Sequence, residues 1–191
     1  MISSMGVDKL WITGAQRVER AYWSSHLLRP ENEAKMRALL VEGLVQSGDP
    51  SVPRLVVAKN LKRLLRDDSY FENGPSGHGA PLIKLACHPE RTAADDDSME
   101  HSDPRLRVAR LGEVELPPDA RVLLAIGPER GWEEPEELEM LVSHGFQLVT
   151  LGPRTLRSDV ACVSMLAVAH EALDAAARRQ AAGAADQAAD K

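Results

Sequence analysis

The stretch LLAIGPERGW, residues 123–132, carries the strongest signal for the fold of this chain. Four apolar residues lead without a break into Gly127, and a proline, a charged pair and Gly131 follow at once. An apolar run without polar alternation is typical of a strand covered on both faces, so residues 121–126 are predicted to form a buried strand. Glycine at the end of such a strand lets the backbone approach a ligand closely, because no Cβ stands in the way.

Five glutamates crowd the segment that follows, between residues 133 and 139. Acidic residues are favoured in the first turn of a helix by its dipole, and proline suits the same turn. We therefore expect a helix over residues 133–144, with Pro135 in its first turn and Gly145 as its C-terminal stop. Two interpretations of the glycine motif stay open at this point, a helix-initiating turn and a ligand-binding loop. The motif is neither a dinucleotide fingerprint nor a P-loop.

Strands and helices alternate along the rest of the chain, as judged from hydrophobic periodicity and from flanking glycines and prolines. The expected strands are residues 7–12, 55–57, 82–87, 121–126 and 146–151, and the expected helices are residues 31–47, 60–66, 133–144 and 159–179. This alternation predicts an α/β domain with a mostly parallel sheet and helices on both faces.

Three segments are expected to lie outside the packed core. Residues 67–80 and 90–104 are predicted to be mobile loops, because they are polar and rich in turn-forming residues. Residues 177–191 are an alanine-rich, low-complexity tail that we expect to fray. The folded domain is therefore expected over residues 1–176, a length that suits one hydrophobic core.

The charge of the chain is uneven. Its formal net charge of -6 does not favour a nucleic-acid binder as a whole. Residues 54–66, however, hold five basic residues and no acid. This run is either an RNA-facing surface or a solvated helix face, and the sequence alone does not decide between them.

Cysteine usage and the N-terminus indicate a soluble cytoplasmic protein. Cys87 and Cys162 stand far apart in apolar settings, which favours two buried thiols over a disulfide framework. The N-terminus lacks the order of a signal peptide, and no apolar run approaches the roughly 18 residues that span a membrane. No spacing of histidines and cysteines suggests a metal site.

Three predicted strands end in distinctive loops, at residues 87–89, 127–131 and 151–154. Ligands of open parallel sheets usually bind at the carboxyl ends of the strands. The sequence therefore predicts a ligand site at this edge.

A second motif, LGPRTLRSDVA at residues 151–161, opens the last predicted helix, for which Ser158 or Asp159 is a good N-cap. The chain resembles the RsmE family of ribosomal RNA methyltransferases in the order and spacing of its motifs, which are IGPERGW, a glutamate, GF and LGPRTLRSDVA. The earlier segments MGVDKLW, RVER and AYW, and the strand that ends in His88-Pro89, fit the same pattern, so that the resemblance covers roughly residues 5–173.

The resemblance implies both a fold and an activity. Members belong to the SPOUT superfamily, whose α/β domain carries a C-terminal trefoil knot, a rare exception to the rule that chains are not knotted. They act as homodimers and use S-adenosyl-L-methionine to methylate N3 of a uridine in small-subunit ribosomal RNA. By the same resemblance the cofactor would be held by His88, Pro89, Ile126, Gly127, Pro128, Glu129, Gly131, Leu151, Gly152, Thr155 and Leu156.

The chemistry of the reaction points to cations in the second motif. Uracil N3 is a poor nucleophile until its proton leaves, and a cation beside the ring oxygens would stabilise the resulting anion. Arg157 is the leading catalytic candidate, and Asp159 would orient it or help to move the proton. The simpler role of Arg157 is a salt bridge to Asp159 or to the acidic helix. The simpler role of Asp159 is to cap the last helix. Substrate RNA contacts are expected from Arg17, Arg20, Arg130 and Arg154.

This chain departs from the family pattern in several places. Arg130 replaces a glycine, Thr155 replaces an isoleucine, and Asp159-Val160 replaces a Glu-Thr pair. The family's N-terminal PUA-like barrel, first strand and most of its first helix have no counterpart here, so a fragment or a reduced form is expected. The alternative to an enzyme is a non-catalytic knotted module that binds cofactor or RNA, or dimerises, without methyl transfer.

Overall fold

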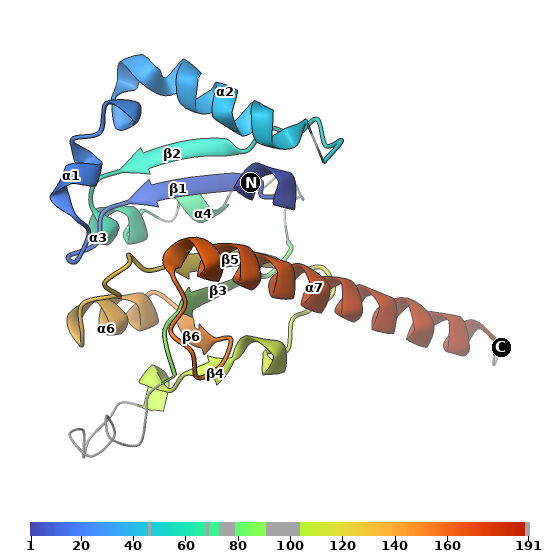
Figure 1. The fold of residues 1–191 in the computed structure, drawn as a ribbon. Coiled ribbons are helices and arrows are strands. Elements are labelled where there is room, and N and C mark those ends of the chain that lie inside the picture. Colours follow the sequence, from blue (N-terminus) through green and yellow to red (C-terminus); the bar gives the residue numbers. More distant parts are fainter. Residues whose placement is uncertain (46, 68, 73–78, 91–103, 190–191) are drawn as a thin grey trace. The chain divides into compact units, whose positions relative to one another are not determined.

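The computed structural model describes residues 1–45, 47–67, 69–72, 79–90 and 104–189 (Figure 1). The chain forms two compact units. Unit 1 comprises Met1–Gly77 and Pro128–Glu137, and unit 2 comprises His78–Gly127 and Leu138–Lys191. The loops predicted over residues 67–80 and 90–104 lie largely outside the described residues.

Unit 1 is built on two parallel strands, β1 (Lys9–Thr13) and β2 (Arg54–Ala58). Parallel neighbours need a crossover, which α2 (Glu33–Leu44) supplies. The shorter helices of the unit are α1 (Arg20–Trp23), α3 (Leu61–Leu65) and α4 (Ser69–Glu72), with 3₁₀ turns at Ile2–Met5, His26–Leu28 and Pro30–Asn32.

The carboxyl ends of β1 and β2 are bound together through Gly14. Its N–H donates to the Ala58 carbonyl at 3.3 Å, and its own carbonyl accepts from the Leu61 N–H at 3.2 Å. A Cβ on Gly14 would lie 2.4 Å from the Lys59 carbonyl oxygen. Only glycine therefore permits this approach of the two strand ends.

Helix α3 begins at that junction. The Asn60 side chain caps it by accepting from the Arg63 N–H at 2.9 Å. Its three leucines, Leu61, Leu64 and Leu65, are buried, which turns the intervening basic side chains outward.

Unit 2 holds a parallel sheet of four strands in the order β4-β6-β3-β5. The strands are β3 (Leu82–Cys87), β4 (Ala109–Arg110), β5 (Arg121–Ile126) and β6 (Phe146–Thr150). Helix α6 (Glu136–Ser143) precedes β6, and 3₁₀ turns cover Pro104–Leu106 and Leu111–Glu113. The long helix α7 (Ser158–Ala189) packs on β5 and on the second of these turns.

A core of Leu85, Leu111, Val149 and Met165 joins the sheet of unit 2 to α7. Leu85 and Val149 come from neighbouring strands and Met165 from the helix, and all four are at most 4% exposed. The α/β class and the parallel sheets predicted from the sequence are confirmed.

Several predicted boundaries are wrong. Helix α6 begins at Glu136, so Pro135 precedes the helix instead of lying in its first turn. Helix α4 and the two-residue strand β4 were not expected, since segments this short carry no periodicity. Helix α7 continues to Ala189, ten residues beyond its predicted end, because alanine is the strongest helix former.

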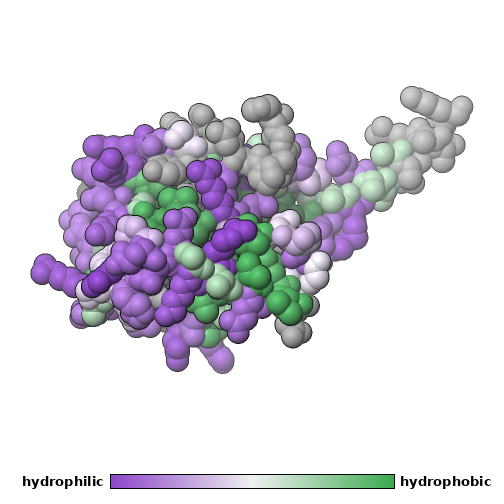
Figure 2. All heavy atoms as spheres, turned by 90° about the horizontal axis from the view of Figure 1, so that it is seen from above, coloured by the Kyte–Doolittle hydropathy of each residue, from purple (hydrophilic) through white to green (hydrophobic). Residues whose placement is uncertain are grey.

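Helix α7 also has the length and composition of a membrane-spanning helix over Ser158–Ala184, contrary to the expectation that no such segment exists. A helix that packs on a protein core passes the same test. Met165, Ala169 and Ala176 are buried in unit 2. Farther along, where α7 extends beyond the sheet, hydrophilic side chains lie beside apolar ones (Figures 1 and 2). Only 17% of the apolar window of this helix is buried within the protein.

The Gly14 junction predicts a steric penalty for a single methyl group. Gly14→Ala should lower the free energy of unfolding by about 1–3 kcal/mol, the usual cost of overpacking. All three tryptophans, Trp11, Trp23 and Trp132, belong to unit 1, so urea titration followed by tryptophan fluorescence reports on the affected unit. Ser51→Ala is the control, since Ser51 is an exposed residue of the same unit and is followed by the same fluorescence. Equal effects of the two substitutions would contradict the packing argument.

Cys87 gives a second prediction. Burial, reinforced by the neighbouring Cys162 thiol, raises the pKa of the Cys87 thiol from 9.0 to about 12. Between these pH values the unfolded thiol ionises while the folded one stays protonated, so the stabilising contribution is complete below pH 9.0 and is lost as the pH rises. Cys87→Ala should make the fall in unfolding free energy between pH 9.5 and 11 shallower, by at most about 1.4 kcal/mol per pH unit. Parallel stability profiles of the two proteins would refute this.

Candidate functional site

Three strand ends are aligned at the carboxyl edge of the sheet in unit 2. Cys87, at the end of β3, pairs with Ile126 of β5 on one side and with Val149 of β6 on the other. The His88 N–H then donates to the Val149 carbonyl at 2.9 Å, which fixes the first residue of the loop. The convergence of the three strand ends predicted from the sequence is therefore confirmed.

The loops that leave this edge combine a buried base with an exposed rim. His88 and Gly152 are buried, and Ile126, Gly127 and Leu151 are half-buried. The exposed residues are Pro89, Arg154, Thr155 and Leu156. The loops at this edge therefore combine backbone groups with the apolar side chains of Ile126, Leu151 and Leu156.

Gly152 shapes the loop after β6. Its φ of 133° lies in a region that favours glycine. The Thr150 hydroxyl donates to the Gly152 carbonyl at 3.0 Å and accepts from its N–H at 3.1 Å. These bonds satisfy the N–H and carbonyl groups of the buried Gly152 and set the direction in which residues 153–157 leave the sheet.

The start of α7 is tied to the end of β5. The Ser158 hydroxyl donates to the Gly127 carbonyl at 3.1 Å. The first helical bond runs from the Ala161 N–H to the Arg157 carbonyl at 2.8 Å. Ser158 and Asp159 therefore lie inside the helix, and the prediction that one of them is the N-cap is wrong. The last residue before the Pro128–Gly131 turn and the first residue of α7 are thus bonded to each other within unit 2.

Arg157 and Asp159 lie together on the exposed rim, with an Arg157 nitrogen 3.1 Å from an Asp159 carboxylate oxygen. Their side chains are 79% and 54% exposed. Exposed ion pairs contribute little net stability, since water competes for both partners. The guanidinium therefore stays accessible to a substrate.

The Pro128–Gly131 segment, which belongs to unit 1, is a tight turn. The Gly131 N–H donates to the Pro128 carbonyl at 2.9 Å, and Gly131 has a φ of 73°. Glu129 and Arg130 are exposed at its tip. Among the described residues only glycines have a positive φ, so the arginine at position 130 fits the turn without backbone strain.

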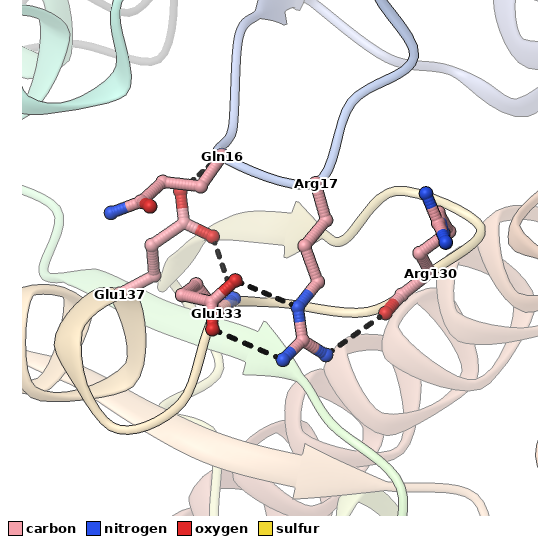
Figure 3. Close-up of polar contacts among 5 residues, drawn as sticks. All are labelled: Gln16, Arg17, Arg130, Glu133 and Glu137. Atoms are coloured by element: carbon pink, nitrogen blue, oxygen red, sulfur yellow. Dashed lines mark hydrogen bonds and ion pairs between the residues drawn. The ribbon is translucent and has the colours of Figure 1, made fainter.

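A hydrogen-bond network, here named the turn clamp, holds this turn in unit 1 (Figure 3). The Arg17 guanidinium donates to both carboxylate oxygens of Glu133, at 2.9 and 3.1 Å, and to the Arg130 carbonyl at 3.3 Å. The buried Glu137 carboxylate accepts from the Gln16 N–H and from the Glu133 N–H, both at 2.8 Å. Arg17, expected to contact RNA, is thus engaged within the protein.

The electrostatics of the clamp keep its ion pair charged at neutral pH. The hydrogen bond to Glu133 raises the pKa of Arg17, and the same bond lowers the pKa of Glu133. Sequence reasoning did not single out Glu137, because it is one of five clustered glutamates and nothing in the pattern marks it as buried.

Four exposed basic side chains lie on α3 or next to its ends in unit 1. We name them the basic face: Lys59, Lys62, Arg63 and Arg66. None of them forms an ion pair with another described residue. Arg20, at the start of α1, is exposed as well. In the part of the chain that the structure describes, no group of three acidic, histidine or cysteine side chains could hold a metal ion.

Comparison with known proteins identifies the family. Residues 1–170 match the model of the RNA methyltransferase domain family. The chain is 31% identical over 173 residues to Ribosomal RNA small subunit methyltransferase E of Treponema pallidum (strain Nichols), an overlap of 88% of this chain and 56% of that protein.

Solved structures agree in fold. Ribosomal RNA small subunit methyltransferase E from Neisseria gonorrhoeae, bound to S-adenosyl methionine, matches with a TM-score of 0.58 at 23% identity, over 87% of this chain and 55% of that one. A putative methyltransferase from Legionella pneumophila, in complex with the same cofactor, matches with a TM-score of 0.55 at 24% identity, over 87% and 56%.

The chain spans little more than half the length of these relatives. The family match nevertheless covers most of the chain, and it includes both glycine motifs and the strands that precede them. The chain therefore belongs to the RNA methyltransferase domain family, and its similarity to Ribosomal RNA small subunit methyltransferase E agrees with the resemblance predicted from the motifs.

Proposed function

We propose that this chain is an S-adenosyl-L-methionine-dependent methyltransferase that acts on N3 of a uridine in small-subunit ribosomal RNA. The observation that carries the proposal is the aligned edge of β3, β5 and β6, where both family motifs leave the sheet. Two relatives of the same fold are described as bound to this cofactor. A trefoil knot, a homodimer and a cytoplasmic location belong to the proposal by family resemblance.

The residues at this edge suit a nucleoside cofactor. Half-buried and buried backbone at Gly127, Leu151 and Gly152 offers carbonyl and N–H groups in a partly desolvated setting, and Leu156 offers an apolar surface for a base. The proposed contacts in unit 2 are His88, Pro89, Ile126, Gly127, Leu151, Gly152, Thr155 and Leu156. Pro128, Glu129 and Gly131 follow Gly127 directly along the chain and are proposed to complete the set. When bound, the cofactor supplies an electrophilic methyl group.

Arg157 is proposed to activate the uridine. Loss of the N3 proton leaves negative charge on the ring oxygens, and a fixed cation lowers the energy of that charge. The Arg157 guanidinium is 79% exposed and lies 3.1 Å from an Asp159 carboxylate oxygen, so it can pair with Asp159 and still reach a substrate. Asp159 is a proposed positioning group for Arg157, or the acceptor of the proton.

RNA is proposed to lie along the basic face. Phosphate contacts supply most of the affinity of nucleic-acid complexes, and lysines and arginines without ion-pair partners among the described residues are free to make them. Arg20, Arg130 and Arg154 are exposed and are proposed to add further contacts. Because the chain as a whole carries a net charge of -6, a local basic surface is needed for binding.

Arg157→Ala should separate chemistry from cofactor binding. We expect the variant to bind S-adenosyl-L-methionine with wild-type affinity but to transfer methyl groups at a rate lower by roughly a hundredfold or more, the effect of removing one preorganised charge-stabilising donor. Transfer of a labelled methyl group to small-subunit RNA, with nucleoside analysis of the digest, measures the rate and identifies the base. Wild-type transfer by the variant would remove Arg157 from the catalytic set.

Reversal of charge on the basic face should weaken RNA binding. The double substitution Lys62→Glu and Arg63→Glu is expected to lower affinity and to flatten the dependence of log K on log salt by about one to two units, since two phosphate contacts are lost. Lys35→Glu with Arg37→Glu, on exposed positions of α2, makes the same change in net charge and serves as the control. Equal loss in both pairs would indicate that net charge alone matters and would contradict a specific surface.

A further inference from the structure

We propose that Arg17 and Glu137 are positioning residues, which hold the Pro128–Gly131 turn in the shape that binds the cofactor. This inference rests on the proposed function, and it assigns Arg17 to cofactor affinity instead of to RNA contact.

The turn itself has little to hold it. Its one internal backbone bond is that from the Gly131 N–H to the Pro128 carbonyl, and its two central residues, Glu129 and Arg130, are exposed. A short turn with exposed central residues and a glycine at φ 73° samples other conformations unless contacts from outside restrict it. Such restriction matters for binding, because a preorganised loop loses less entropy when its ligand arrives.

Arg17 supplies that restriction at the carboxyl side of the turn. The Arg17 guanidinium donates both to the Arg130 carbonyl and to the Glu133 carboxylate. A single planar group therefore holds the backbone of the turn and the Glu133 side chain together. The fork-like geometry of arginine is required here, because lysine cannot make the paired bonds to Glu133 and still reach a third acceptor.

Glu137 anchors the other side of the clamp. Its side chain is 3% exposed, and its two carboxylate oxygens accept from two backbone N–H groups, those of Gln16 and Glu133. A buried carboxylate without such donors would be strongly unfavourable, so the two backbone segments are held to it. The segment that follows the turn is thereby bound to the Gln16–Arg17 loop.

The Gln16–Arg17 loop is itself a rigid support. Two residues earlier, Gly14 is bonded to Ala58 and Leu61 and touches the Lys59 backbone. The clamp therefore connects the turn to the ends of β1 and β2 through backbone hydrogen bonds within unit 1. Three of the five N–H donors of the Arg17 guanidinium are engaged in this way, two with the Glu133 carboxylate and one with the Arg130 carbonyl.

The test compares ligand affinities of the wild-type chain with those of Arg17→Ala, Arg17→Lys and Glu137→Gln. Glutamine replaces one acceptor oxygen with a donor, so it fails to accept one of the two N–H groups. We expect calorimetric affinity for S-adenosyl-L-methionine to fall about tenfold in each variant, the factor that corresponds to one charged hydrogen bond. In methyl-transfer assays KM for the cofactor should rise while KM for RNA stays unchanged.

Two controls separate positioning from a general structural role. Arg37→Ala removes an exposed arginine of the same unit that takes no part in the clamp, and its cofactor affinity should equal that of wild type. The exchange of Arg17→Glu with Glu133→Arg re-forms the ion pair and should recover part of the affinity that Arg17→Ala loses. Thermal unfolding without ligand verifies that each variant is folded.

The outcomes are distinguishable. If Arg17→Ala and Glu137→Gln bind the cofactor as tightly as wild type, the positioning role is refuted while the proposed function stands. If Arg17→Ala loses RNA affinity and keeps cofactor affinity, Arg17 is an RNA contact and the inference is likewise refuted. If folded wild-type chain binds no cofactor, the proposed function fails first and the inference falls with it.

Discussion

The register of three parallel strands is the constraint on which the site in unit 2 depends. Cys87 stands between Ile126 and Val149, so β3, β5 and β6 end at one level of the sheet. The His88 N–H, the Thr150 hydroxyl and the Ser158 hydroxyl then each bond to a backbone group near that edge. A shift of one residue in any strand would turn its side chains to the opposite face and separate these loops. The core beneath, with Leu85, Leu111, Val149 and Met165, opposes such a shift.

The two loops that carry the family motifs owe their sharp turns to glycine, and side-chain hydrogen bonds hold those turns in place. Gly152 and Gly131 adopt backbone conformations that other residues resist, which lets each loop turn sharply. Sharp turns are not by themselves rigid, however, and side-chain hydrogen bonds hold both loops, one from a near neighbour in the sequence and one from a distant residue. Thr150 bonds to Gly152 in unit 2, and Arg17 bonds to Arg130 in unit 1. The charged side chains left outside these bonds, Arg157 above all, remain accessible for chemistry.

Much of the fold could be predicted from local patterns, and the clamp could not. Strands β3 and β5 match their predicted limits because their apolar runs are bounded by proline and glycine. The starts of α6 and α7 differ from their predicted limits, and Ser158, a predicted N-cap, instead donates its hydroxyl to the Gly127 carbonyl 31 residues away. Partners such as Gln16 and Glu137 are 121 residues apart, and no periodicity relates them. The acceptors of Arg17 also lie more than a hundred residues away, so the sequence could not show that its guanidinium bonds to Glu133 and Arg130.

Calorimetric titration of the folded chain with S-adenosyl-L-methionine and S-adenosylhomocysteine, beside a folded Gly127→Val variant, tests the central claim most directly. The aligned edge predicts that the wild-type chain binds both compounds, at close to one molecule per chain, and that a branched side chain at the end of β5 abolishes binding. A folded wild-type chain that binds neither compound, or a Gly127→Val variant that binds as tightly as wild type, would contradict the assignment of this edge as the cofactor site.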